Sequence, residues 1–582
     1  MRRHHGLALL AFCALLAATA SGADLATLVP EDAVLYAEVT DPAGIWADFE
    51  QSGLRDIVRA AGPAEMQFRL VSVIVQQVAL QQFGVQWSDF VGKYMSRFAL
   101  VATDSGGPGR APVLLLDASQ SRADLEKLLK ETVETTLKAK QPAVTFGDER
   151  YQDLPLRIVN GPSGTAAYGF LGDAMAIGEP AGVKKLIDAR ARRPLASNEA
   201  FAAVRAGLAV PRGLVAYLNV ARILADHRGI LDGNPELARR LDDAGLSHAQ
   251  WLAFSSAFDG RGVRDRLHLY TGDKKIGLVR LLGSLSPGTS AAATVLPKEC
   301  PLVAALTFKD GPELWRAIVK FIEEGGDAEG LARLDEGKRN VLLQFGINLD
   351  EDLVAALGGE VFLAANPDFA AEFAAKRRMP TNKDFAFLLG LRVAKPEALK
   401  TIIHRVIASQ PVVGQGVERK VEPYQGVEIN TLVLPGAEVR PAYAFVGDYL
   451  LIARSDAVLR RCIDAHATGQ SLAAAPRYRA VAEKMTGKHN AFLFVDIESL
   501  LVAAIAGGQA PPEGQPASLP VQLAGQLRGV CASLVGEKDG VRVEAYSRPG
   551  FAALVAAAIG IVQRGAVAPP PAGPREPKPA DF

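Results

Sequence analysis

The chain has 582 residues, which is too long for a single hydrophobic core and suits two to four domains of about 100–200 residues each. Hydrophobic residues make up 49% of the chain and charged residues 22%, a composition typical of a globular protein. Lys plus Arg and Asp plus Glu both number 64, so the charge balance speaks against a strongly basic protein and predicts no nucleic-acid partner.

The N-terminus has the three parts of a secretory signal. Arg2 and Arg3 precede an apolar run over residues 7–18, and small residues continue to Ala23. The run is shorter than the stretch of about 20 residues that crosses a bilayer, so a cleaved signal peptide over residues 1–23 is favoured over a retained membrane anchor. The mature protein is therefore expected in the periplasm or outside the cell.

The first predicted element of the mature chain is a short strand over residues 34–39. A helix is expected to begin at Asp41 and Pro42, because Asp is a favoured N-cap and Pro is favoured in the first turn. A longer, core-facing helix is expected from Pro63 to Phe83, where apolar residues recur at four-residue spacing. Two strands and a charged helix follow, over residues 98–102, 112–116 and 122–138.

Antiparallel strands are predicted further along the chain. Residues 168–174 (YGFLGDA) alternate in polarity and contain a Gly-Asp pair, which predicts a hairpin with a tight turn. The next helix is expected to begin at Glu179 and Pro180. A last hairpin is expected about an Asp259-Gly260 turn, with arms over 251–258 and 263–270. Short antiparallel groups interrupted by helices indicate an α+β fold, a largely antiparallel sheet packed against helices.

Internal similarity is the strongest signal in the chain. Residues 168–174 match residues 443–449 (YAFVGDY). Other matches keep the same order and nearly the same separation: Tyr151-Gln152 with Tyr424-Gln425, 186–189 with 462–465, 217–220 with 494–497, Trp46 with Trp315, and Asp259-Gly260 with Asp539-Gly540. The sequence therefore predicts two diverged copies of one domain, over residues 24–285 and 286–549.

The segment 550–582 differs from both copies. Residues 551–562 are apolar on all sides but make a helix of only about 18 Å, against roughly 30 Å of hydrocarbon in a bilayer. We expect a short docking helix there, with a weak membrane or protein contact as the alternative. The tail after Pro569 is Pro-rich and is expected to be extended.

Three cysteines remain once the signal peptide removes Cys13: Cys300, Cys462 and Cys531. An odd number at wide spacing is not a disulfide framework, and the sequence leaves open whether any pair forms. Cys462 and His466 are spaced as possible ligands on one helix. The internal match places Cys462 at the position of Leu186, however, which favours a core residue over a metal ligand. Cys300 corresponds to Ala33 and Cys531 to about Trp251, which favours the same interpretation.

No motif of zinc, redox, acyl-transfer or nucleotide chemistry occurs in the sequence. The glycine-rich stretch 106–109 lacks a phosphate-binding lysine and is interpreted as a loop, and the basic run 376–378 as a solvated surface. The acids at 350–352 are interpreted as the first turn of a helix rather than the start of a calcium loop. No catalytic, cofactor-binding or metal-binding residue is therefore assigned, and no cofactor is expected.

Several segments together carry a family resemblance: residues 28–39 (LVPEDAVLYAEV), 349–363 (LDEDLVAALGGEVFL), 445–452 (FVGDYLLI), and Ser471-Leu472 with Tyr478. They resemble a family of exported bacterial proteins known as domain of unknown function 3352. The resemblance touches most of both halves and supplies no functional residues. Residues 91–97 depart from the pattern that residues 354–360 keep, which suggests that the two copies do not do identical work; if the function is one-sided, this divergence is the first place to look.

The leading functional hypothesis is a non-enzymatic periplasmic or secreted protein that binds or scaffolds a partner on its surface or between its halves. It depends on the two domains, the signal peptide and the lack of a catalytic motif. One alternative is a carrier of apolar, lipid-like ligands, suggested by the apolar stretches 70–78 and 551–562. The other alternative is a hydrolase whose titratable residues converge only in the folded protein.

Overall fold

The computed structural model describes the following residues: 24–60, 94–104, 112–119, 121–162, 164–208, 210–325, 328–370, 387–409, 416–436, 440–485, 487–506 and 525–550, with positions 77, 80, 81, 86 and 372. Several expected features fall outside the described residues: the signal peptide 1–23, most of the helix from 63 to 83, the stretches 106–109 and 376–378, and the apolar segment 551–562.

Among the described residues, twenty strands form one sheet. The first ten are β1 (Leu35–Thr40), β2 (Arg97–Ala102), β3 (Val113–Asp117), β4 (Thr145–Tyr151), β5 (Leu154–Gly161), β6 (Gly164–Leu171), β7 (Ala174–Gly178), β8 (Gly213–Asn219), β9 (Trp251–Asp259) and β10 (Gly262–Tyr270). The others are β11 (Leu302–Thr307), β12 (Leu357–Ala365), β13 (Phe387–Val393), β14 (Glu418–Tyr424), β15 (Val427–Val433), β16 (Ala442–Val446), β17 (Tyr449–Ala453), β18 (Ala491–Asp496), β19 (Gly529–Glu537) and β20 (Gly540–Ser547).

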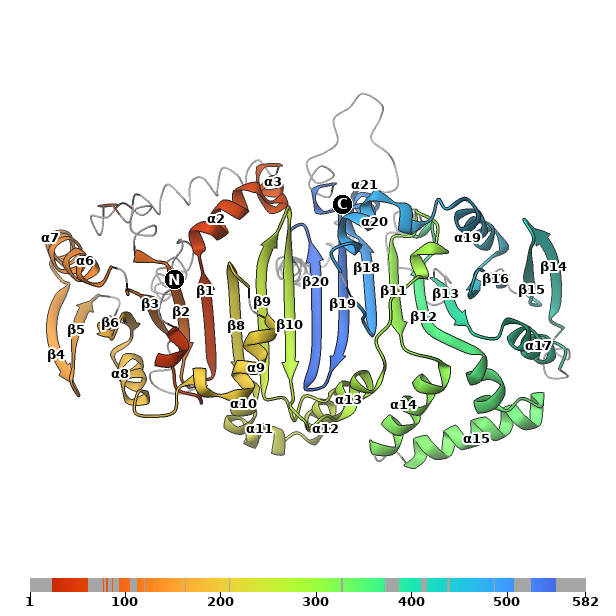
Figure 1. Cartoon of the computed structure of the whole chain (residues 1–582), viewed down its shortest axis with the longest axis horizontal. Helices are drawn as coiled ribbons and strands as arrows, with labels where there is room; N and C mark the ends of the chain where they lie inside the picture. Colours follow the sequence, from red (N-terminus) through yellow and green to blue (C-terminus); the bar gives the residue numbers. More distant parts are fainter. Residues whose placement is uncertain are drawn as a thin grey trace, which may run out of the picture.

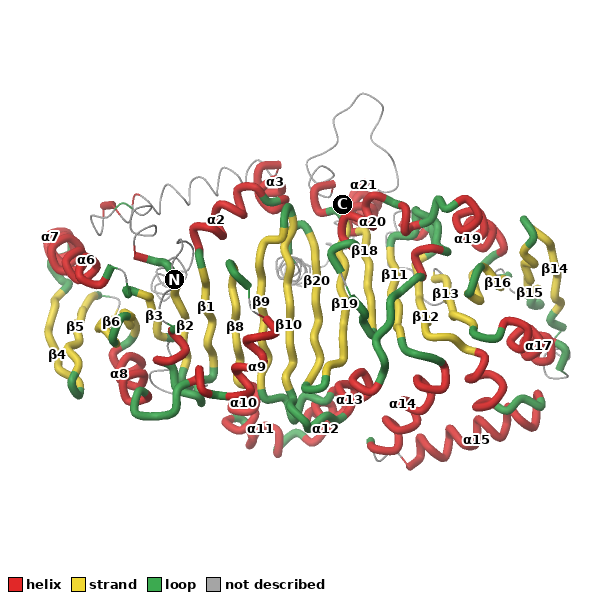
Figure 2. The backbone as a smooth tube through the Cα atoms, viewed as in Figure 1, coloured by secondary structure: helices red, strands yellow, loops and turns green. Residues whose placement is uncertain are grey.

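The two halves of the chain have the same strand order. The first half runs from the sheet edge as β4, β5, β6, β7, β3, β2, β1, β8, β9, β10. The second half runs as β14, β15, β16, β17, β13, β12, β11, β18, β19, β20. All of these pairings are antiparallel. Figure 2 shows the strands side by side along the length of the molecule, with helices gathered beyond both strand ends.

The halves meet at the pair β10 and β20, in the middle of the sheet (Figure 1). Val263 pairs with Ser547 near one end of this seam, and Leu269 pairs with Val541 near the other end. Arg266 and Glu544 pair midway between them. The register is therefore symmetric about Arg266 and Glu544, as in a two-fold contact between identical subunits. The expectation of an α+β fold with a largely antiparallel sheet is confirmed, and the two halves share one sheet.

The helices of the first half are α2 (Pro42–Gln51), α3 (Gly53–Ala60), α6 (Arg122–Lys127), α7 (Thr135–Lys140), α8 (Pro180–Ala189), α9 (Glu199–Leu208), α10 (Val220–Asp226), α11 (Arg228–Asp232), α12 (Pro235–Ala244) and α13 (Gly277–Ser284). Those of the second half are α14 (Gly311–Glu324), α15 (Ala328–Phe345), α17 (Pro396–Ile407), α19 (Asp456–Thr468), α20 (Pro476–Ala482) and α21 (Ile497–Ala506). No helix among the described residues is both long and apolar enough to cross a membrane.

One face of the sheet, here called the inner face, packs against helices in both halves. In the first half, Phe201 of α9 lies with its ring centroid 4.6 Å from that of Tyr217 and 6.0 Å from that of Trp251. In the second half, Tyr478 of α20 lies 5.0 Å from Phe494 by the same measure. Each half thus has its own buried aromatic and aliphatic core on this face.

The opposite face, here called the outer face, is covered only in part among the described residues. Near one end of the sheet, Leu125 of α6 packs against Phe98 and Leu116. Near the other end, Leu399 of α17 packs against Leu391 and Leu450. Alternation along each strand places these residues opposite the inner core. The central part of the outer face lies between these two covered regions, and two of its residues, Leu306 and Val361, pack against Phe308 and Ala317 of a smaller cluster.

Most of the predicted elements lie where the sequence places them. Asp41 caps α2 by accepting the N–H of Gly44 at 2.9 Å. Gly172 and Gly447 take left-handed φ values of 64° and 55° in the two Gly-Asp turns, so both predicted hairpins are confirmed. The predicted charged helix over 122–138 is present as α6, a wider helical turn (Leu128–Glu134) and α7.

The predicted alignment of the last hairpins is wrong by two residues. The turn residues are Gly260 and Arg261 in the first half, but Lys538 and Asp539 in the second. Asp259 closes its hairpin opposite Gly262, and Glu537 closes the other opposite Gly540. The repeated Asp-Gly letters therefore do not occupy equivalent positions, because strand pairing sets the register.

Candidate apolar binding face

Alternate residues of six strands in the second half form an aliphatic surface on the outer face. We call it the apolar face, and its members are Ala304, Leu306, Val361, Leu363, Leu389, Ala491, Leu493, Ala532, Leu534 and Val543. All ten are half-buried or exposed. Strand pairing aligns them in rows, since Leu363 pairs with Ala304 and Leu493 with Ala532. The two-residue period of a strand turns all of them to one side.

The apolar face encloses a shallow hollow of about 520 Å³. Leu363 is 41% exposed and Leu493 is 37% exposed within it. No charged residue lines the hollow. Burying a whole leucine side chain is worth about 1.5–3 kcal/mol, so a molecule covering these two leucines gains part of that from each. A contiguous exposed aliphatic surface is typical of a binding site rather than of ordinary protein surface.

Residue size explains why this hollow lies in the second half. Asp259 and Glu537 are the last paired residues before the turns of their hairpins. Aligning the two hairpins on these residues makes Phe254 of β9 equivalent to Ala532 of β19. A phenyl ring in the first half is thus replaced by a methyl group in the second. In the same way Leu214 of β8 is equivalent to Ala491 of β18. Both replacements remove atoms from the outer face and leave the leucines around them uncovered.

Polarity also differs between the halves at the seam end of this face. The place of Val543 is taken in the first half by Asp265, a buried carboxylate that is 4% exposed. The last described residue, Gly550, stands beside it: a Cβ built on Gly550 would lie 3.3 Å from Val263 and 3.6 Å from Asp265. The chain therefore leaves the described structure on the outer face, next to the apolar face.

The region where the sequence predicts divergence also differs in structure. Arg97 of β2 pairs with Thr40, and Glu360 of β12 pairs with Thr307, so a base and an acid occupy equivalent places. Arg97 forms an ion pair with the buried Glu38, at 3.0 Å. Residues 91–93 lie outside the described residues.

Glu360 is held by backbone and hydroxyl donors instead of a base. It is 1% exposed and accepts the N–H of Ala291 at 3.0 Å and the hydroxyls of Ser290 and Tyr449. Burial, and then the charge of Glu360, raise the pKa of Tyr449 far above its usual range. Both arrangements join a buried carboxylate to the inner core, so the divergence at this point is structural.

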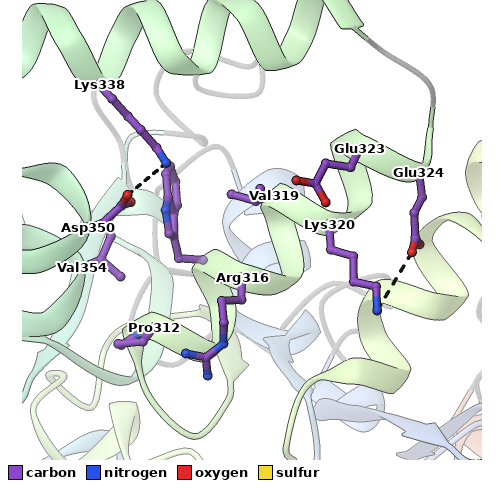
Figure 3. Close-up of a pocket in the computed structure, with 10 residues that line it drawn as sticks. Pro312, Arg316, Val319, Lys320, Glu323, Glu324, Lys338, Asp350 and Val354 are labelled. Carbon is purple, nitrogen blue, oxygen red and sulfur yellow. Dashed lines mark hydrogen bonds and ion pairs between the residues drawn. The ribbon is translucent and has the colours of Figure 1, made fainter.

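A second pocket lies along α14, at the lower edge of the molecule in Figure 1, and Figure 3 shows its lining. Asp350 is paired with Lys338 at 3.0 Å, and Glu324 with Lys320 at 4.0 Å. The Lys338 ammonium also lies 5.3 Å from the centre of the Trp315 ring. Two of the three carboxylates that line the pocket are thus held by lysines, which does not favour the paired carboxyl groups of a hydrolase.

The cysteines singled out in the sequence lie in the second core. Cys300, Cys462 and Cys531 are free and at most 1% exposed. Burial raises the pKa of the Cys462 thiol to about 12, which suppresses the reactive thiolate. His466 is exposed, so it does not share a site with Cys462. Cys531 pairs with Phe494 as Ala253 pairs with Tyr217, so its equivalent is Ala253 rather than Trp251.

The acids at 350–352 stand in the first helical turn, Leu349–Leu353, as the sequence predicts. The amide oxygen of Asn348 accepts the backbone N–H of Asp350 at 3.1 Å, which caps that turn.

The residues of the apolar face were not singled out by the sequence. Strands such as β11 carry apolar residues on both sides, so their pattern alone does not show which side lies exposed.

Comparison with known proteins identifies a family for the chain. The family model described as "Protein of unknown function (DUF3352)" matches residues 276–569, half of the 582-residue chain. The chain belongs to this family. The DUF3352 match begins at α13 and contains the apolar face. Three of the segments that carry the resemblance, 349–363, 445–452 and Ser471-Leu472 with Tyr478, fall inside it, whereas residues 28–39 fall outside.

No curated protein matches the chain. Two solved structures are similar over part of the chain. One is "Structure of crystal form I of TP0453", with 9% identity and a TM-score of 0.22, covering 44% of this chain and 82% of that chain. The other is "Structure of crystal form III of TP0453", with 8% identity and a TM-score of 0.23, covering 47% of this chain and 91% of that chain. Scores of this size do not establish a shared fold.

Proposed function

We propose that this DUF3352 protein is an exported, non-enzymatic binding protein that holds a flexible apolar chain, such as the acyl chain of a lipid, on its apolar face. The hollow of about 520 Å³, which is lined mainly by the aliphatic side chains of the apolar face, carries the proposal. When a polar group of a ligand is buried without a hydrogen-bond partner, it loses its bound water at a cost of several kcal/mol. Since the ten side chains of the apolar face offer no such partner, an aliphatic ligand fits better than a polar one.

An acyl chain also suits the shape of this surface. The hollow is shallow and open, and its rows of side chains follow neighbouring strands. A flexible chain follows such rows, whereas a rigid polycyclic ligand needs a deep, preformed cavity. The apolar segment 551–562 of the protein itself is the other occupant to test, because Gly550 lies beside this surface.

The hollow is tested by filling it with the residue that stands in the first half. The variant Ala532→Phe places a ring there, and we expect about a tenfold or greater loss of affinity for palmitate, corresponding to about 1.4 kcal/mol. The measurement is displacement of a dansyl-labelled fatty acid from the mature protein. Leu343→Asp is the matched control, because Leu343 is a 76% exposed leucine on α15, outside the apolar face.

Two further variants separate the possible outcomes of this assay. Leu493→Asp puts a charge into the hollow and is expected to abolish binding. Leu554→Asp puts a charge into the apolar segment 551–562 and so tests whether that segment occupies the apolar face. Tighter fatty-acid binding in that variant means that the segment competes for the apolar face. Unchanged affinity in Ala532→Phe and Leu493→Asp, or no binding by the unmodified protein, contradicts the proposal.

Export is proposed on the sequence of residues 1–23. Asp24 accepts the N–H of Ala26 at 3.2 Å and pairs with Arg205 at 2.8 Å. Cleavage after Ala20 or Ala23 leaves these contacts intact. When the full gene is expressed in a Gram-negative host, the periplasmic protein is expected to have the mass of a chain beginning at Ser21 or Asp24. Recovery of the uncleaved chain in the cytoplasm alone counts against export.

We also propose that the halves, 24–285 and 286–549, arose by duplication. Their identical strand order supports this origin, as does a shared hydrogen-bond device. In the first half the Tyr151 hydroxyl donates to Asp188 at 2.9 Å. In the second half the Tyr424 hydroxyl donates to Asp464, also at 2.9 Å. The hollow then represents a specialisation of one copy.

A further inference from the structure

Three side chains that are far apart in the sequence converge at one end of the central seam. His268 is near the end of β10, Glu537 is the last residue of β19, and Asp539 is in the turn that leads to β20. The Nε2 atom of His268 is 3.7 Å from Glu537 Oε2 and 3.9 Å from Asp539 Oδ1. The three ligand atoms lie within 4.8 Å of one another. This end of the seam is at the bottom of the sheet in Figure 1.

The histidine is the buried member of the group. His268 is 4% exposed, and its Nε2 atom has no hydrogen-bond partner among the described residues. Burial lowers the pKa of His268, although Glu537 and Asp539 oppose this shift. Buried polar atoms normally have a partner, so an Nε2 atom that faces two carboxylates fits a role as a metal ligand.

The equivalent cluster at the other end of the seam shows what differs here. When the two hairpins are aligned by their strand pairing, Asp259 is equivalent to Glu537, Tyr546 to His268, and Arg261 to Asp539. Lys484 lies 2.8 Å from Asp259 and balances its charge with a fixed ammonium group. The His268 cluster therefore has an acid, Asp539, in place of the base Arg261, and an imidazole in place of the phenol of Tyr546.

The cations around the His268 cluster do not occupy the carboxylate oxygens that face His268. Arg542 binds Glu537 through Oε1 at 2.9 Å, so Oε2 faces His268. Lys275 donates to the backbone carbonyl of Glu537 rather than to its carboxylate. Oδ1 of Asp539 faces the same Nε2 atom, at 3.9 Å.

We propose that His268, Glu537 and Asp539 bind one divalent transition-metal ion, with Zn²⁺ as the best match. One imidazole and two carboxylates form a three-ligand set that leaves a position for water. Neighbouring ligands of a tetrahedral ion with bonds of about 2.0–2.1 Å lie about 3.4 Å apart. The observed separations of 3.7 and 3.9 Å need only small side-chain shifts. The ion ties β10 of the first half to the β19–β20 hairpin of the second.

The test is calorimetric titration of the metal-free, full mature protein with ZnCl₂. One equivalent is expected to bind, and Asp539→Asn is expected to weaken binding by about tenfold or more. This variant is chosen because the backbone carbonyl of Asp539 keeps its hydrogen bonds from the N–H groups of Thr271 and Gly272. His268→Gln is expected to lose binding as well.

The matched control is His248→Gln, which removes an exposed histidine elsewhere and is expected to bind Zn²⁺ like the unmodified protein. Zn²⁺ is also expected to raise the melting temperature of the unmodified protein and of His248→Gln, but not of Asp539→Asn. Absence of one-to-one binding overturns the proposal and leaves a simple ion-pair cluster. Equal affinity in Asp539→Asn overturns it too, even if His268→Gln does not fold.

Discussion

At the scale of single residues, buried titratable groups set the response of the protein to pH. His489 is 5% exposed, and its ring stacks on Phe492 with centroids 5.3 Å apart. Its backbone pairs with Gly288, in the segment before β11. Burial lowers the pKa of His489, and the opposing charge of Glu360 does not offset this effect.

Acid is therefore expected to destabilise the fold through His489. Its folded-state pKa is below the unfolded value of about 6.5, so the unfolded chain takes up the proton first. The stabilising contribution is complete above pH 6.5 and is lost as the pH falls toward the folded-state pKa. In thermal melts between pH 7.5 and 5, His489→Gln is expected to lose less stability than the unmodified protein. The exposed His248→Gln serves as control, and equal slopes for His489→Gln and the unmodified protein contradict the assignment.

Comparison of matched positions made some of the residue assignments possible from sequence. Cys462 matches Leu186, and both are fully buried at 0% exposure in equivalent helices. The residues of the proposed metal site were not predicted from the sequence, because they have no local spacing to compare. His268 lies in the first half and Glu537 in the second, so no local spacing joins them. Only the antiparallel seam brings them together.

At the scale of elements, a repeated clamp holds an edge hairpin to a helix in each half. Gln152 and Gln425 both adopt left-handed φ values, 52° and 48°, in the turns that follow β4 and β14. Their side-chain amides donate to Asp188 at 2.6 Å and to Asp464 at 2.7 Å. The conserved letters Tyr-Gln in the two halves thus mark a turn shape and a hydrogen-bond set together.

Removing one carboxylate is expected to loosen only its own hairpin. Asp464→Ala is expected to speed hydrogen–deuterium exchange over β14 and β15 and to leave β4 and β5 unchanged, because the two clamps share no atoms. Asp188→Ala is expected to give the reverse pattern, and each variant is thus the control for the other. Exchange that rises in both hairpins, or in neither, shows that the clamp does not hold the edge strands.

Element types were more predictable than register. The helix that begins after Asp41 and the Gly172 and Gly447 hairpins follow from local rules for caps and turns. The turn of the last hairpin was not predicted correctly, because Asp539-Gly540 repeats the letters of Asp259-Gly260 two residues out of register. Hydrogen-bond pairing with β18 fixes that register, and it involves residues outside any local window.

At the scale of the whole molecule, the two halves share one 20-stranded sheet. Burying the inner face takes one set of helices per half, which matches the two cores. The outer face has helices near both ends, and small residues at Ala491 and Ala532 leave the apolar face in the second half. Sequence alone predicted two related halves but not their fusion at β10 and β20, because strand-to-strand contacts between distant segments leave no periodic signature.

Native mass spectrometry is the best test of whether the apolar face holds an acyl chain. The protein and Ala532→Phe are isolated from the periplasm of one host under conditions that preserve complexes. We expect a one-to-one adduct with the mass of a fatty acid or phospholipid on the unmodified protein, and we expect Ala532→Phe to lose most of it. Bare protein in both samples, or the same adduct in both, contradicts the proposal.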